Sequence, residues 1–204
     1  MVIQTEKDIV NLVKNDPSMM RILEIAKTLN LPDWWICAGF VRSKVWDTLH
    51  EYPKRTDLPD IDVVYYDPFN IDEQFEKQME STLKNIAPEE PWSVKNQARM
   101  HILNGESPYR STIDAVARFP ETSTSIALKL NNENELMIAC PWGIEDLITL
   151  KIKPTPFFIE KESLAAIYES RLEKKKWNQK WPRVRVYGIN GELLNGKESW
   201  KSFS

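Results

Sequence analysis

The sequence predicts an α+β fold in which helices flank a mixed sheet. Segments with the two-residue period of strands and segments with the spacing of helices follow one another without strict alternation, which argues against a doubly wound sheet. The chain has 204 residues, of which 42% are hydrophobic and 10% aromatic. That length and composition suffice for the core of one domain with a small appendage.

Two helices are predicted at the start of the chain. Thr5 is placed to cap the first, and Asp16-Pro17 starts the second, because a short polar residue followed by proline is typical of a helix start. The apolar residues of the second helix share one face: Met19, Ile22, Leu23, Ala26 and Leu29. Leu31-Pro32-Asp33 ends this helical stretch.

A glycine turn links the first predicted strand to a third helix. Residues 34–38 form a short apolar run that Gly39 breaks, and helical periodicity follows. A turn that opens directly into a helix leaves N–H groups and a positive dipole end available to a phosphate. Arg42 and Lys44 lie in the first turn, where cations are usually disfavoured, so a bound anion would explain them. The alternative is that both are solvated surface residues and that Gly39 merely turns the chain.

Two aspartates open the next predicted strand, residues 60–66. Because side chains alternate along a strand, Asp60 and Asp62 point to one face and the apolar residues between them point to the other. Neighbouring carboxylates repel each other, and a divalent cation bound through oxygen relieves that repulsion. The sequence therefore predicts a metal site at Asp60 and Asp62, with Mg²⁺ or Mn²⁺ as the ion. Metals held this way can assist in-line displacement without a covalent nucleophile.

Cations are expected on a later strand. After an amphipathic helix that Asn70 is placed to cap, residues 92–101 alternate clearly, with Lys95, Arg99 and His101 on one face. If this strand neighbours the aspartate strand, those side chains would neutralise phosphate charge. The alternative is an ordinary solvent-exposed face.

The remaining segments continue the mixed pattern. A short helix over 112–119 carries Asp114, a candidate third carboxylate or simply a first-turn acid. A hairpin is expected over 126–140, a helix over 145–152 and a longer helix capped by Ser163. From Trp181 on, a hairpin or an extension is expected.

Composition excludes several classes of protein. Twenty-seven basic and thirty acidic residues leave a formal charge of −3, which provides no overall attraction to nucleic acid or to an anionic membrane. No apolar run is long enough for a membrane span and the first residues lack a signal-peptide core, so a cytoplasmic location is expected. Cys37 and Cys140 lack companion histidines and are expected as buried thiols, with a disulfide as the second choice.

Several motifs together resemble a known family. Gly39-Phe40-Val41-Arg42 followed by Asp60-Ile61-Asp62-Val63 resembles the head-domain signature of the polymerase-beta-like nucleotidyltransferase superfamily, in particular that of tRNA CCA-adding enzymes. Further segments resemble a bacterial family of stand-alone nucleotidyltransferase-like proteins: Val94–His101, Pro108-Tyr109, Ser111–Ala115, Phe119–Thr122, Pro141–Leu147 and Lys153–Pro156. The resemblance covers most of the chain and implies a nucleotidyltransferase-type mixed sheet flanked by helices.

The resemblance also implies site residues. Asp60 and Asp62 would bind metal, and Gly39 with Arg42 would shape a triphosphate pocket. Phe40 stands where the superfamily often has a second small residue, and no acid lies between Trp92 and Leu103. Either Asp114 substitutes for a third carboxylate, two carboxylates suffice, or turnover is weak or absent.

The expected function is metal-dependent transfer of a nucleotidyl group from a nucleoside triphosphate to an unknown acceptor hydroxyl. The expected catalytic residues are Asp60, Asp62 and Asp114, and the expected nucleotide-binding residues are Gly39, Phe40, Arg42, Lys44, Lys95 and Arg99. The alternative is a catalytically silent module of the same fold that binds nucleotide or RNA. Acceptor, base preference and oligomeric state are left open.

Residues 1–160 are expected to form the head domain with its N-terminal helices, and residues 161–204 a C-terminal helix and extension packed on it. Roughly ninety residues after Asp114 are too few for the neck, body and tail domains with which full CCA-adding enzymes grip tRNA. Basic and aromatic residues interleave between Arg171 and Arg185, which suits RNA contact. The alternative is a helix end whose lysines compensate the dipole.

Overall fold

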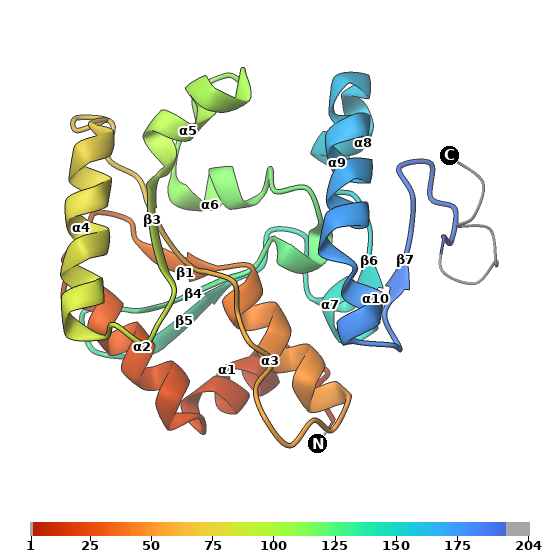
Figure 1. Ribbon diagram of the computed structural model, residues 1–204, viewed down its shortest axis with the longest axis horizontal. Coiled ribbons are helices and arrows are strands. Elements are labelled where there is room, and N and C mark those ends of the chain that lie inside the picture. The colour runs from red at the N-terminus through yellow and green to blue at the C-terminus, as the bar shows by residue number, and fades with distance from the viewer. Residues whose placement is uncertain (1, 195–204) are drawn as a thin grey trace.

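A five-stranded sheet with helices on both faces forms the body of the molecule (Figure 1). The computed structural model describes residues 2–194. The helices are α1 (Glu6–Lys14), α2 (Pro17–Lys27), α3 (Gly39–Leu49), α4 (Glu73–Ile86), α5 (Gln97–Asn104), α6 (Thr112–Val116), α7 (Glu145–Ile148), α8 (Pro156–Glu160), α9 (Glu162–Lys175) and α10 (Trp177–Lys180), with the 3-10 turn η1 (Thr122–Thr124). The strands are β1 (Trp35–Cys37), β2 (Ile61–Tyr65), β3 (Trp92–Asn96), β4 (Ala127–Leu130), β5 (Leu136–Ala139), β6 (Lys151–Ile152) and β7 (Arg185–Val186).

The large sheet is mixed, as predicted. Its strand order is β3-β2-β1-β4-β5, with β2 and β3 parallel and the other neighbours antiparallel. Helix α4 makes the crossover between the two parallel strands, which a short turn cannot join. In that register Asp62 lies beside Ser93 and Val64 beside Lys95, so the condition set for Lys95, that its strand neighbours the aspartate strand, is met.

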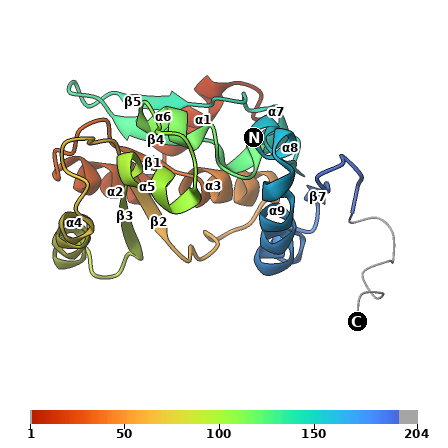
Figure 2. The same cartoon turned by 90° about the horizontal axis from the view of Figure 1, so that it is seen from above.

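The two faces of the sheet have different cores. Ile36, Ile61 and Val63 point to the larger core, which includes the buried side chains of α1, α2 and α3. The opposite face carries a small cluster that includes Cys37 and Val64 and is covered by α6. Figures 1 and 2 show α5 and α6 on one side of the sheet and the first three helices on the other. Since side chains alternate, Asp62 shares the α6 face with Val64.

Local sequence signals account for the first helices. Thr5 and Asp8 form a capping box at α1, and the Asp16 carboxylate accepts from the N–H groups of Ser18 and Met19 at α2. Both predicted starts are confirmed. The hairpin of β4 and β5 is also confirmed, and its turn contains Asn134 in the left-handed region (φ 61°).

A helix, α5, follows β3 where the alternating sequence predicts a continued strand. The strand predicted over 92–101 ends at Asn96, whose side chain accepts from the Ala98 N–H and caps α5. Arg99 and His101 therefore lie on a helix, and the expectation that they share a strand face with Lys95 is wrong. A polar strand face and a short polar helix have similar sequence patterns, and the cap decided between them.

Further boundaries also differ from expectation. Strand β2 spans Ile61–Tyr65, so Asp60 precedes the strand, and α6 ends at Val116 instead of Phe119. Asp72, not Asn70, caps α4 by accepting from the Gln74 N–H. The helix expected over 145–152 stops at Ile148, and the chain continues into β6. Ser163 lies inside α9, which begins after Lys161 without a side-chain cap.

The C-terminal segment packs on the rest of the molecule. Strand β7 pairs in parallel with β6, and the buried indole N–H of Trp181 donates to the Asp47 carboxylate at 2.7 Å. Tyr52 donates to the Lys180 carbonyl. The division into residues 1–160 and 161–204 stays a prediction, and residues 195–204 lie outside the described residues.

No helix between residues 2 and 194 combines the length and apolar character needed to cross a membrane. Cys37 and Cys140 are both free thiols, Cys37 fully buried and Cys140 partly, so the disulfide alternative does not hold.

Candidate active site

The turn before α3 borders the candidate site. Ala38 has φ 54° and ψ −113°, a conformation that L-residues rarely adopt, and Gly39 is the first helical residue. The expectation that Gly39 itself breaks the strand is therefore wrong by one position. The Ala38 carbonyl accepts from the N–H groups of Val41 and Arg42, and no side chain caps the helix. The first N–H groups of α3 are thus available to a ligand.

Asp62 lies on the α6 face of the sheet, and Asp60 directly precedes β2. Asp62 is mostly buried, and burial, followed by the negative charge of Asp60, raises its pKa from 3.8 to about 6. A hydrogen bond from the Ser93 side chain and the positive charges of Lys175 and Arg171 act in the opposite direction. The Asp62 carboxylate is therefore poorly solvated and lies within electrostatic reach of a second carboxylate.

Asp62 opens into a cleft of about 530 Å³. Its floor includes Ala38, Asp62 and Val64, and α5 and α9 supply opposite walls. The remaining lining residues are mostly apolar or aromatic, among them Met100, Leu103, Tyr109, Phe119, Phe158, Leu164 and Ile167. A cleft with apolar walls and a few convergent charges is the usual form of a small-molecule site.

Arg42 lies behind this site. Its side chain is buried, with the guanidinium 5.3 Å from the ring centroids of Trp46 and Trp181 and 5.7 Å from that of Trp177. It donates to the Ser43 hydroxyl, while its Nε has no partner within the described residues. Burial lowers the pKa of Arg42 to about 10, so the group stays charged at neutral pH. Arg42 does not line the cleft.

Two other residues expected at the nucleotide are engaged elsewhere. The Phe40 side chain is 1% exposed and belongs to the larger core. The Lys44 ammonium lies 2.7 Å from the carboxylate of Asp16, the cap of α2. The nucleotide-binding roles expected for Phe40 and Lys44 stay predictions.

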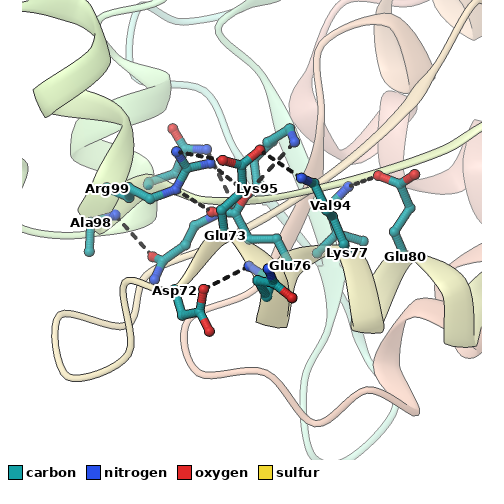
Figure 3. A network of polar contacts seen from close by, with 12 residues as sticks. Asp72, Glu73, Glu76, Lys77, Glu80, Val94, Lys95, Ala98 and Arg99 are labelled. Carbon is teal, nitrogen blue, oxygen red and sulfur yellow. Dashed lines mark hydrogen bonds and ion pairs between the residues drawn. The ribbon is translucent and has the colours of Figure 1, made fainter.

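Arg99 belongs to a separate polar network around Glu76 (Figure 3). Glu76 on α4 is 0% exposed and accepts from Arg99 Nε at 2.9 Å and Nη2 at 2.8 Å, and from the Asn96 N–H at 3.1 Å. Hydrogen bonding to Glu76 raises the pKa of Arg99. Lys95 lies 3.6 Å from the same carboxylate and also lines the cleft. The structure thus brings Lys95 to the site and holds Arg99 away from it.

Asp114 is paired with arginines of its own segment. Its carboxylate accepts from the Arg110 N–H and lies 3.2 Å from the Arg118 guanidinium. Among residues 2–194 no group of three or more histidine, cysteine or acidic side chains is arranged to hold a metal ion. The structure therefore does not assemble a third carboxylate with Asp60 and Asp62.

A nucleotidyltransferase family model matches residues 24–186, which is most of the chain and contains every element described for the site. The chain belongs to this nucleotidyltransferase family.

Solved structures agree with this family. A structure described as revealing a CCA-adding enzyme head domain is 33% identical, covers 91% of this chain and 97% of its own, and superposes with a TM-score of 0.83. The Thermotoga maritima CCA-adding enzyme in complex with tRNA is 16% identical and has a TM-score of 0.54, a likeness of fold alone. The chain covers 93% of its own length but 44% of that enzyme. No curated protein matches the chain.

Sequence reasoning missed the partners that this family member assembles across the cleft. Arg171 of α9 lines the cleft with Asp62 and donates to Glu121, which is fully buried. The interleaved segment from Arg171 to Arg185 is expected to suit RNA contact, yet its Trp177 and Trp181 are buried and leave no ring face for a base. Fifty residues separate Glu121 from Arg171, so no local pattern links them.

Proposed function

We propose that this nucleotidyltransferase transfers a nucleotidyl group from a nucleoside triphosphate to an acceptor hydroxyl. The proposal rests on Asp62, which lines a cleft that also contains Ala38 at the uncapped start of α3, and on Asp60, whose negative charge acts on Asp62. The two aspartates favour a divalent cation, and the start of α3 favours phosphate. A metal–triphosphate complex contains both.

The aspartate pair suits Mg²⁺ or Mn²⁺. Both ions take oxygen ligands, and Mg²⁺ usually keeps several waters while binding one or two carboxylates and substrate phosphates. Burial and then the negative charge of Asp60 raise the pKa of Asp62, and the positive charges of Lys175 and Arg171 only partly offset them. A bound divalent ion would supply charge neutralisation for the triphosphate and for the departing pyrophosphate.

The chain's own groups orient the reactants. In this proposal the N–H groups of Gly39 and Phe40, which follow the cleft-lining Ala38, donate to phosphate oxygens, and the apolar part of the lining packs against the nucleotide. In the reaction the acceptor oxygen bonds to the α-phosphorus, the bond from that phosphorus to the bridging oxygen breaks, pyrophosphate leaves, and the hydroxyl proton passes to solvent. No covalent enzyme nucleophile is needed.

The first test is binding. Isothermal titration of the folded protein with ATP, CTP, GTP and UTP in the presence of Mg²⁺ is expected to show binding of at least one triphosphate. Absence of binding for all four would remove the proposal.

The second test concerns catalysis. Incubation with labelled triphosphates and cell extract is expected to give a labelled product whose rate of formation falls about 10²- to 10³-fold in Asp62→Asn, the effect typical of losing a charge that stabilises the transition state. Asp57→Asn, an exposed carboxylate just before β2, is the matched control and should keep the wild-type rate. An equally active Asp62→Asn protein would contradict the assignment. Asp114→Asn tests whether the paired Asp114 takes part.

The absence of a third carboxylate from the described site favours one other candidate, a silent module that binds nucleotide or RNA. It predicts triphosphate or RNA binding without any labelled product. The same two experiments separate the candidates.

A further inference from the structure

Arg171 is the guanidinium that α9 presents to the cleft. Its side chain is 34% exposed and lines the cleft together with Asp62. The positive charge of Arg171 acts on Asp62, and the negative charges of Asp62 and Asp60 act on Arg171. The three groups therefore interact electrostatically. Figures 1 and 2 show α9 as a separate wall beside the sheet, so the cation comes from a different part of the chain than the acids.

Glu121 fixes the position of that guanidinium. Its carboxylate, fully buried, accepts from Arg171 Nε at 2.7 Å and from Nη2 at 3.1 Å, and the Thr124 hydroxyl donates to it at 2.8 Å. The Glu121 backbone is itself held by a bridge to Pro154. A fork held on two of its nitrogens has little freedom left, and its third nitrogen, Nη1, has no protein partner within the described residues.

Three of the cations expected at the nucleotide are engaged elsewhere, while Lys95 lines the cleft and lies 3.6 Å from Glu76. Lys44 pairs with Asp16, Arg99 with Glu76, and Arg42 is enclosed by tryptophans behind the site. A triphosphate in the cleft would carry several negative charges next to the two carboxylates, so it requires positive groups on the facing wall. Arg171 meets that requirement, and Lys175 lies one helical turn further along α9, where its charge also acts on Asp62.

We infer that Arg171 binds the phosphates of the nucleotide and that Glu121 is the residue that positions it, so that the C-terminal helix α9 completes the site begun by the sheet. This inference rests on the proposed function. It assigns the triphosphate a place between the aspartate pair and α9. It also gives a physical reason why the family match runs through α9 to residue 186.

The test is a binding cycle between the two residues. Removing Arg171 alone would leave a buried, unpaired carboxylate, so the central variant neutralises both partners, Glu121→Gln with Arg171→Gln; a neutral pair of similar size often preserves stability. Affinity for Mg²⁺–triphosphate, and for Mg²⁺–tripolyphosphate as a probe without a base, is expected to fall about 10- to 100-fold. The matched control is Arg21→Gln with Glu89→Gln, an exposed pair at 2.7 Å far from the cleft, which should bind as wild type.

The positioning role has its own readout. If Glu121 acts through Arg171, Glu121→Gln alone weakens triphosphate binding, and adding Arg171→Gln costs less than Arg171→Gln costs in the wild-type background. Additive losses would contradict the positioning role of Glu121.

The outcomes separate the two ideas. If the wild type binds no triphosphate, the proposed function fails. If the wild type binds and the folded double variant binds equally well, the inference about Arg171 fails while the proposed function stands. Should thermal melts show the double variant unfolded, Arg171→Lys keeps a cation for Glu121 but loses the fork, and unchanged affinity in that variant would overturn the inference.

Discussion

Glu76 on α4 and Asp62 on β2 are two acids near β3 whose charges are compensated to very different extents. Glu76, on the α4 side, is fully buried and accepts from the Arg99 fork and from the Asn96 N–H (Figure 3). Asp62, on the α6 face, is mostly buried, has Ser93 as its hydrogen-bonding side chain, and faces a second negative charge at Asp60. A buried charge is costly unless it is paired and hydrogen-bonded, so the first acid stabilises the fold and the second weakens it.

The difference separates structural charge from functional charge. The Glu76 network satisfies its donors and acceptors and covers the outer edge of β3, where the N–H groups of Val94 and Asn96 would otherwise be unpaired. The negative charge of Asp60 and Asp62 is only partly compensated beside a cleft, as in a site where a ligand supplies the rest of the compensation. Lys95 touches both regions, since it lines the cleft and lies 3.6 Å from Glu76.

The largest expected effect is the loss of unfolding free energy when the Glu76 network is broken. Glu76→Ala leaves Arg99 and the Asn96 N–H without their acceptor, and breaking a buried pair in this way typically costs about 3–5 kcal/mol of unfolding free energy. Urea denaturation measures it. Glu73→Ala, one turn earlier on α4 with its carboxylate 3.9 Å from Arg99, is the control and should cost less than about 1 kcal/mol. Equal losses in the two variants would show that the Glu76 network does not stabilise the fold.

An intermediate effect is expected in the pH dependence of stability, because Asp62 titrates differently in the folded and unfolded states. Because the pKa of Asp62 is raised from 3.8 to about 6 by folding, the native state binds more protons than the unfolded state between those values, and stability from this group falls as pH rises through that range. The loss is at most about 3 kcal/mol and is complete above pH 6.

The measurement compares unfolding free energies of wild type and Asp62→Asn from pH 4 to 7 in the presence of a chelator. The wild type should lose stability relative to the variant over this window, and the variant should be the more stable protein at pH 7. A difference that stays constant with pH would mean that Asp62 titrates normally.

The smallest effect is expected at the turn beside the cleft, which stores conformational strain instead of charge. Ala38 at φ 54° should be relieved by Ala38→Gly, which is expected to raise stability by up to about 1 kcal/mol. Gly39 is helical, and an added Cβ would meet only ordinary contacts at 3.8 and 3.9 Å. Gly39→Ala should therefore keep wild-type stability within about 0.5 kcal/mol in thermal melts. A loss of unfolding free energy above about 2 kcal/mol in Gly39→Ala would mean that Gly39, and not Ala38, has the unusual backbone conformation.

Much of the fold was predictable because it depends on local signals. The caps at Thr5 and Asp16, the alternation of the aspartate strand and the hairpin near Asn134 all involve residues close in sequence. Predictions failed where two local signals competed. At Asn96 a strand-like alternation continued past a residue whose side chain caps a helix, and the cap prevailed.

For the site, the sequence by itself determined the acids: a two-residue period places Asp60 and Asp62 on one face of any strand they form. Only the tertiary structure decided which cations meet them. Arg99 pairs with Glu76 on α4, and Arg171 on α9 lines the cleft. Both positions depend on how α4 and α9 pack against the sheet. Pairings across such distances depend on how whole elements pack, and sequence periodicity carries no information about that packing.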